Sequence, residues 1–280
     1  MKNLYVRAIT GILYVALLVG SLLWSDISFA LFFAAVVGLS VWEFCTVINE
    51  NLNASVNRFI ASIGAVSFVL AMWQCCKISP SYQFFLPFLV TMLYLLISEL
   101  YRNEADPLKN WGYAFAAQLY VTLPLSLIFF LGYRYDAMSD TLPYDFVLPL
   151  SVFIFLWTSD TGAYLFGSTL GRYFPAKLFP RISPNKSWIG SLGGGILCLF
   201  AAAVLWHFFP DRLSLPAWLG LGLVVCVFGT WGDLVESLFK RRLGIKDSGR
   251  ILPGHGGMLD RFDSALLAVP AAVIYLIGVI

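Results

Sequence analysis

The sequence predicts an all-α fold in which a bundle of about nine helices crosses a membrane. Hydrophobic residues make up 59% of the 280-residue chain and charged residues only 12%, against roughly 45–50% and about 25% in soluble domains. The mean hydropathy is +0.80. Because a bilayer core about 30 Å thick is crossed by roughly 20 apolar residues in a helix, this composition excludes a soluble globule and favours a polytopic membrane bundle.

Apolar windows of that length with few charges give the expected spans. They run over about residues 8–24, 27–48, 59–76, 83–98, 112–133, 144–167, 188–209, 215–239 and 263–280. Only a short polar run that contains Lys77 and Pro80 separates the third window from the fourth. The first window follows a basic start, as in a signal peptide, but no small-x-small cleavage site follows it. We therefore expect a retained first span.

Basic residues fall mainly on one side of the predicted spans. With nine spans, 15 of the 18 Lys and Arg residues lie on the side of the amino terminus, and the other side has only Lys77, Arg134 and Arg212. Cytoplasmic loops accumulate basic residues, so we expect a cytoplasmic amino terminus and a carboxyl terminus outside. An even number of spans would spoil this division.

The chain is expected to form one membrane domain, 1–280, whose halves differ in character. Residues 1–145 have short loops and scattered charge, which indicates a scaffold bundle. Residues 146–280 contain the dense polar motifs and two predicted cytoplasmic loops, about 168–187 and 240–262, so this half is expected to carry the chemistry. The cysteines show no metal-ligand spacing or disulfide framework and are expected to pack in the spans; they are Cys45, Cys75, Cys76, Cys198 and Cys226.

Four carboxylates interrupt the predicted spans, at a cost of roughly 2.5–3.5 kcal/mol each near the bilayer centre. They are Glu43, Asp160, Asp233 and Glu236. No polar motif surrounds Glu43, so pairing or packing is favoured there. For Asp160, pairing with a neighbouring span and contact with substrate carry equal weight.

The cytoplasmic end of the eighth predicted span carries a polar stripe. Asp233, Glu236, Ser237 and Lys240 stand at i, i+3, i+4 and i+7, so they share one face of a helix. A stripe of this kind is expected to face the protein, since lipid cannot solvate it.

A glycine-rich run, PGHGGMLDRFD from Pro253 to Asp263, follows in the next loop. Asp260 and Asp263 stand one turn apart and would share a face if the ninth helix begins there. Together with Asp233 they are expected to converge at the cytoplasmic boundary. Clustered carboxylates beside anionic ligands favour Mg²⁺, a hard cation that takes oxygen ligands.

Basic residues around this predicted magnesium site can hold a phosphate-rich ligand. They are Lys186, Lys240, Arg241, Lys246, Arg250 and Arg261. Basic residues beside a span are often topology markers, and this reading is favoured for Arg242. For His255, between glycines, a structural hydrogen bond and acid/base work carry equal weight. His207, beside Trp206, is expected to lie at the far membrane interface.

The loop residues resemble the signature of phosphatidate cytidylyltransferases, also called CDP-diacylglycerol synthases. The matching residues run from Ser237 to Asp263 and are Ser237, Phe239, Lys240, Arg241, Lys246, Asp247, Gly249, Leu252, Pro253, His255, Gly256, Gly257, Met258, Asp260, Arg261, Phe262 and Asp263. Two upstream segments, Asp160–Tyr164 and Ser183–Trp188, also resemble the family. Ile189 departs from the Glu or Gln common in the family, so no polar contact is assigned there.

The resemblance implies the reaction of CTP with phosphatidate to give CDP-diacylglycerol and pyrophosphate. It implies Asp233 and Asp260 as magnesium ligands, with a second, monovalent cation such as K⁺ allowed. The residues expected to be catalytic are Lys240, Arg241, Lys246, Asp247 and Asp263. Those expected to bind substrate are Asp160, Lys186, Ser187, Ser237, His255 and Arg261. The implied partners are CTP, phosphatidate, the bilayer of a bacterial inner membrane and a second copy of the chain, without a nucleic acid.

Other functions are also open. A transporter would contain intramembrane carboxylates too, but it predicts polar residues through the whole membrane depth, whereas these gather at one face. A cytidylyltransferase for another lipid phosphate is harder to separate, because generic apolar residues form the acyl-chain pocket. A CDP-alcohol phosphotransferase is disfavoured, since its DGxxAR run is missing. No Walker-type loop or HxGH motif occurs, so nucleotide binding would depend on metal and basic side chains.

Overall fold

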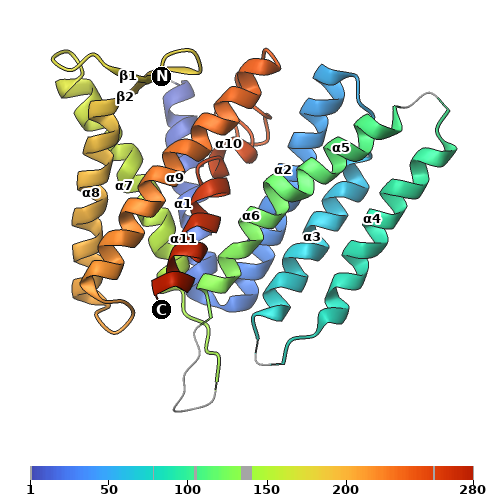
Figure 1. Ribbon diagram of the computed structural model, residues 1–280, viewed down its shortest axis with the longest axis horizontal. Helices are drawn as coiled ribbons and strands as arrows, with labels where there is room; N and C mark the ends of the chain where they lie inside the picture. Colours follow the sequence, from blue (N-terminus) through green and yellow to red (C-terminus); the bar gives the residue numbers. More distant parts are fainter. Residues whose placement is uncertain (1, 78, 104–105, 134–140, 255, 280) are drawn as a thin grey trace. The chain divides into compact units, whose positions relative to one another are not determined.

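The structure is a computed structural model that describes residues 2–77, 79–103, 106–133, 141–254 and 256–279, with side chains from Ile9 onward. Helices form most of it (Figure 1). The chain divides into two compact units. The amino-terminal unit comprises Met1–Phe146 and Leu243–Phe262, and the carboxy-terminal unit comprises Val147–Arg242 and Asp263–Ile280.

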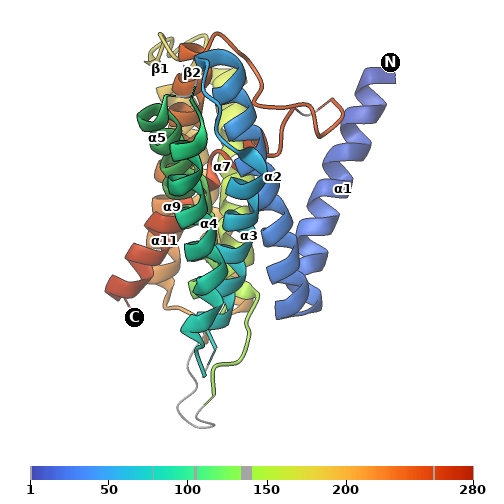
Figure 2. The ribbon, with the colours of Figure 1, turned by 90° about the vertical axis from the view of Figure 1, so that its right-hand side faces the viewer.

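The amino-terminal unit is entirely helical in its named elements. They are α1 (Lys2–Trp24), α2 (Asp26–Leu52), α3 (Arg58–Cys75), η1 (Tyr82–Phe85), α4 (Leu86–Ser98), η2 (Glu99–Tyr101), α5 (Pro107–Ala117), η3 (Gln118–Thr122), α6 (Leu123–Ser126), η4 (Leu127–Leu131) and α10 (Leu259–Phe262). Helices α1 and α2 meet at their shared turn and diverge away from it (Figure 2). Ser25 caps α2 through a reciprocal hydrogen bond with Ser28, which makes this turn tight.

The predicted fifth span is irregular within a continuous helical run, Pro107–Leu131. Residues Gln118–Thr122 form a π-helical turn that ends two residues before Pro124. Because proline has no backbone N–H to donate to the preceding turn, the hydrogen-bond pattern loosens there.

Aromatic side chains pack α10 against the core of the amino-terminal unit. Phe262 is fully buried, with ring centroids 5.8 Å from Tyr14 of α1 and 6.1 Å from Phe33 of α2. Phe33 continues the cluster to Phe29. Edge-to-face packing of this kind stabilises aromatic clusters beyond simple area burial, so the short α10 has a fixed place.

The carboxy-terminal unit contains α7 (Val147–Leu170), β1 (Lys177–Phe179), β2 (Ser183–Ser187), α8 (Trp188–Phe208), α9 (Leu215–Arg242) and α11 (Ala265–Val279). Helices α7 and α8 lie side by side (Figure 1). A Cβ on Gly162 would lie only 2.7 Å from the carbonyl oxygen of Gly193. Small residues therefore let the two helices approach closely, as is common in membrane bundles.

The structure agrees with a helical membrane protein. Among the described residues, seven helices are long and apolar enough to span a bilayer. Helices α1 and α7 fall at the first and sixth predicted windows but do not meet that criterion, and α1 contributes a shorter apolar stretch, Ile9–Trp24. The count of nine and the sides of the two termini stay predictions. Arg134, used in the charge division, lies outside the described residues.

Two local features differ from the sequence-based expectation. The loop predicted at 168–187 contains an antiparallel hairpin, in which Lys177 pairs with Ser187 and Phe179 with Ser183. The helix that begins at Leu259 breaks after Phe262, so Asp263 lies in a turn before α11. Asp260 and Asp263 are therefore not on one uninterrupted helix.

Candidate functional site

The polar stripe of α9 is present, and its first member binds a lysine from another element. The Nζ atom of Lys186, on β2, lies 2.5 Å from Oδ2 of Asp233 and 3.4 Å from the carbonyl oxygen of Thr230. The hydroxyl of Ser237 donates to Oδ1 of Asp233 over 3.1 Å. Asp233 is 31% exposed, so its carboxylate is both oriented and accessible.

The second carboxylate of the stripe is buried. The Glu236 side chain is fully buried and forms an ion pair with Lys240 one turn later. Removing a carboxylate from water costs several kcal/mol unless a partner compensates it. Lys240 therefore has a structural partner as well as its predicted catalytic role.

Asp263 is a further acidic residue of the carboxy-terminal unit. Its Oδ1 accepts a hydrogen bond of 2.5 Å from the backbone N–H of Ser264. It interacts electrostatically with two other carboxylates, Asp233 and Asp160, and with the ammonium of Lys240. The like charges repel one another, and the Lys240 ammonium offsets part of this repulsion.

Asp160 opens on a small cavity of about 180 Å³ in the same unit. Lys186 and Ser187 line the cavity with it. The Ser187 hydroxyl also accepts a hydrogen bond of 3.2 Å from the N–H of Gly190 and caps α8. The cap holds Ser187 at the cavity, since it fixes the start of α8 beside it.

In the amino-terminal unit, Asp260 organises the glycine-rich loop. Its carboxylate accepts hydrogen bonds from the N–H of Ser248, at 2.9 Å and 3.1 Å to the two oxygens, and from the N–H of Gly257 at 2.7 Å. Gly256 has φ +83°, and a Cβ there would lie 2.7 Å from Asp260 Oδ2. Only glycine adopts this conformation at no steric cost, so the Asp260 carboxylate and the positive φ together explain the glycine at position 256.

Glu43 of α2 also binds this loop and helps to fix its conformation. It is buried, and its Oε2 accepts a hydrogen bond of 2.9 Å from the N–H of Leu259. A Cβ at Gly249 or Gly257 would overlap its carboxylate. The prediction that Glu43 is paired or packed inside the protein is thus confirmed. Its partner is the signature loop, at a residue 216 positions away in the sequence.

A cavity of about 700 Å³ lies against the outer side of this loop. Three cations line it, Lys246, Arg250 and Arg261, together with Asp247. All four are exposed. Thr10 of α1 donates to the carbonyl oxygen of Pro253 over 3.2 Å, which holds the loop against α1. Such a cavity suits a ligand with several negative charges.

The oxygen-rich side chains fit a magnesium ion of the usual kind. Within the described residues, no group of three or more His, Cys, Asp or Glu could hold a metal ion by itself. Mg²⁺ commonly takes one or two carboxylates and completes its shell with phosphates and water. Asp233 is 31% exposed, and the Asp260 carboxylate is oriented by hydrogen bonds from the backbone N–H groups of Ser248 and Gly257.

The predicted site residues do not all lie in one compact unit. Asp233 belongs to the carboxy-terminal unit and Asp260 to the amino-terminal unit, so their convergence stays a prediction. Arg241 is exposed at the end of α9. His255 lies outside the described residues.

Sequence reasoning missed two contributors to the loop, Glu43 as its anchor and Ser248 as a donor to Asp260. The energetic cost of an intramembrane carboxylate was a signal for Glu43. No spacing rule could have supplied its partner. Ser248 offered no signal, because it acts through its backbone N–H.

Comparison with known proteins identifies the family to which the chain belongs. The model of the cytidylyltransferase family matches residues 5–278. A phosphatidate cytidylyltransferase of Staphylococcus aureus (strain COL) is 36% identical over 233 residues, which cover 82% of this chain and 85% of the relative. Phosphatidate cytidylyltransferases of Staphylococcus haemolyticus (47% over 145 residues; 52% of this chain, 53% of the relative) and Staphylococcus epidermidis (48% over 147 residues; 52% and 53%) are also similar.

Proposed function

We propose that this chain, which belongs to the cytidylyltransferase family, joins CTP to phosphatidate and forms CDP-diacylglycerol and pyrophosphate. The observation that carries the proposal is the cavity of about 700 Å³ in the signature loop, lined by Lys246, Arg250 and Arg261. A triphosphate and a lipid phosphate together carry several negative charges, and clustered Lys and Arg side chains neutralise them. The apolar helices supply the bilayer contact that a lipid substrate requires.

The reaction is an in-line displacement at phosphorus. An oxygen of the phosphatidate phosphate forms a bond to the α-phosphorus of CTP, and the bond from that phosphorus to the bridging oxygen of the β-phosphate breaks. Pyrophosphate leaves with the electron pair. A phosphate monoester has a second pKa of about 6, so the nucleophile is ionised at neutral pH and no general base is required.

The residues of this chain position the reactants and stabilise charge. Lys240, Arg241 and Lys246 stabilise the developing pyrophosphate, and Arg261 holds a phosphate oxygen. Lys186 and Ser237, which both contact Asp233, orient that carboxylate and can turn to an anionic substrate. Asp233 and Asp260 are the proposed magnesium ligands; the ion would neutralise the triphosphate and polarise its phosphorus–oxygen bonds.

Asp160, Ser187, His255, Asp247 and Asp263 complete the proposed site. Asp160 and Ser187 line the small cavity beside Lys186, which supports a role in substrate binding. We place the site on the cytoplasmic side of a bacterial inner membrane, because CTP is water-borne and phosphatidate is held in the bilayer. We also propose that the protein binds a monovalent cation and forms a homodimer.

The direct test supplies the purified protein with a panel of nucleotides and lipid phosphates and measures pyrophosphate release. We expect magnesium-dependent turnover with CTP and phosphatidate. Turnover of a polyprenyl or ether lipid phosphate in preference to phosphatidate would overturn the substrate assignment. Solute flux through liposomes without nucleotide turnover would favour a transporter.

The Asp260→Asn variant tests the metal assignment separately from the loop. We expect a loss of activity that a higher magnesium concentration restores in part, together with faster amide hydrogen exchange at Ser248 and Gly257, whose N–H groups donate to this carboxylate. Full activity at ordinary magnesium would sink the ligand assignment. Faster exchange without magnesium rescue would assign Asp260 a structural role alone.

A further inference from the structure

We propose that the amino-terminal unit contains a second ligand site, which binds the phosphate group of an anionic phospholipid. A cavity of about 800 Å³ is formed by the end of α2, the loop 53–57, the start of α3 and the end of α4. Its lining includes Trp42, Ser55, Arg58, Tyr94, Ile97 and Arg102. None of these residues belongs to the signature motif or to the proposed catalytic machinery, so the inference does not depend on the proposed function.

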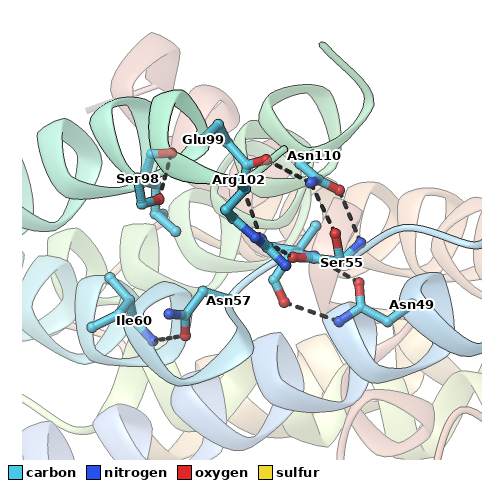
Figure 3. Close-up of polar contacts among 10 residues, drawn as sticks. Asn49, Ser55, Asn57, Ile60, Ser98, Glu99, Arg102 and Asn110 are labelled. Carbon is cyan, nitrogen blue, oxygen red and sulfur yellow. Dashed lines mark hydrogen bonds and ion pairs between the residues drawn. The ribbon is translucent and has the colours of Figure 1, made fainter. Parts of the chain in front are cut away.

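The wall formed by the loop 53–57 is fixed by the side chains of two asparagines, Asn49 and Asn110. Asn49 accepts from the N–H of Val56 and donates to its carbonyl oxygen, both over 2.9 Å. Asn110, only 3% exposed, accepts from the N–H of Ser55 over 2.9 Å and donates to Glu99 over 2.8 Å. Figure 3 shows these side chains gathered around Ser55. Because polar groups in such networks are satisfied by one another, the loop is held in one conformation before a ligand arrives.

The two arginines of the cavity have different electrostatic surroundings. Arg102 lies 2.9 Å from the buried carboxylate of Glu99 and donates to the Ser55 carbonyl over 2.5 Å, so its charge is compensated. Arg58 lies over the Trp42 ring at 4.4 Å and donates to the Thr46 hydroxyl over 3.2 Å. Within the described residues it forms no ion pair. A guanidinium has five N–H donors, so Arg58 offers both an uncompensated charge and free donors to a phosphate.

The outer surface of α4 indicates a lipid as the source of that phosphate. The span Tyr82–Tyr101 is only 17% buried, and Val90, Leu93 and Ile97 on it are more than half exposed. Ile97 also lines the cavity, as do the half-polar rings of Tyr94 and Tyr101. Tyrosine and tryptophan side chains with Lys or Arg are typical of the headgroup level of a membrane. A phospholipid whose phosphate binds Arg58 could therefore place its acyl chains along α4. A free phosphate ion would not contact this apolar surface.

The test measures lipid retention by the purified full-length protein with native mass spectrometry. Phosphatidylglycerol and phosphatidylcholine with identical acyl chains are titrated in parallel. We expect the anionic lipid to bind at least about tenfold more tightly, and Arg58→Gln to remove this preference, since tenfold corresponds to one charge-assisted contact. The matched control is Arg172→Gln, because Arg172 also stacks on an aromatic ring, Tyr173 at 4.6 Å, but lines no part of this cavity; its preference should be unchanged.

Two further arms keep the proposal falsifiable if Arg58→Gln does not fold. In the wild-type protein, amide exchange in residues 53–60 should be slower with phosphatidylglycerol than with phosphatidylcholine, and equal exchange would overturn the site. Millimolar inorganic phosphate should leave the bound lipid in place. Displacement of the lipid by phosphate alone would show an anion site without lipid recognition and would contradict the proposal.

Discussion

Two pairs of carboxylates at the candidate site, one pair in each compact unit, are held in different ways. In the carboxy-terminal unit, the carboxylates of Asp233 and Glu236 face the ammonium groups of lysines. In the amino-terminal unit, Glu43 and Asp260 accept hydrogen bonds from backbone N–H groups. Both arrangements compensate a negative charge, but they differ in how easily the carboxylate can change its partner.

A lysine side chain is a flexible partner that can move when a ligand arrives. A carboxylate paired with lysine can therefore exchange that contact for a metal ion, while the lysine turns to a phosphate. Backbone N–H groups are fixed by the fold and cannot leave without unfolding the loop. Asp233 therefore has a partner that can move, whereas the N–H group that Glu43 binds is fixed by the fold.

The largest expected effect is on Asp233, the accessible member of the lysine-paired set. We expect Asp233→Asn to lower kcat about 1,000-fold, because it removes a proposed ligand of the magnesium ion and electrostatic stabilisation of the transition state contributes on this order, while the unfolding temperature changes little. Magnesium-dependent pyrophosphate release measures it. Asp211→Asn, an exposed carboxylate in the turn between α8 and α9, is the matched control and should keep activity within about twofold. Wild-type turnover in Asp233→Asn would show that the reaction does not need this carboxylate, and would contradict the contrast between Asp233 and Glu43.

A large loss of stability is expected when the buried ion pair of α9 is broken. Lys240→Met leaves the fully buried Glu236 carboxylate without its lysine, and breaking such a pair costs about 3 kcal/mol or more. The free energy of unfolding in denaturant measures this loss.

The double variant Glu236→Gln/Lys240→Met separates the two roles of Lys240. Removing both charges should restore most of the stability, since no unpaired charge stays buried. Activity should stay low if Lys240 also stabilises pyrophosphate. Recovery of full activity along with stability would assign Lys240 to structure alone.

Much of the fold was readable from the sequence, because the cost of unsatisfied backbone groups in lipid forces apolar windows into helices. The hairpin of β1 and β2 was not readable. Its strands, Lys177–Phe179 and Ser183–Ser187, are too short to show a period of two. The turn at Asp263 was also missed, since the break after Phe262 depends on how its ring packs against Tyr14 and Phe33.

The candidate site was readable in part for a similar reason. The α9 stripe follows from helical spacing alone, and the contact between Ser237 and Asp233 at i, i+4 confirms it. The contacts of Glu43 with the loop and of Lys186 with Asp233 join residues far apart in the chain. Such partners are set by tertiary packing, and a single sequence contains no rule that pairs them.

The smallest expected effect concerns the glycines that enclose Glu43. A Cβ at Gly257 would overlap the Glu43 carboxylate and lie 2.5 Å from the Ser248 hydroxyl. We expect Gly257→Ala to destabilise the loop by about 2 kcal/mol, as overpacking of a buried site does, and to speed amide exchange in residues 248–259. Gly112→Ala is the matched control, because a Cβ there meets nothing within 4 Å, and alanine in a helix should leave stability equal or slightly higher. Equal exchange in both variants would mean that Glu43 does not fix this loop, and the distinction between exchangeable and shape-holding carboxylates would then fail.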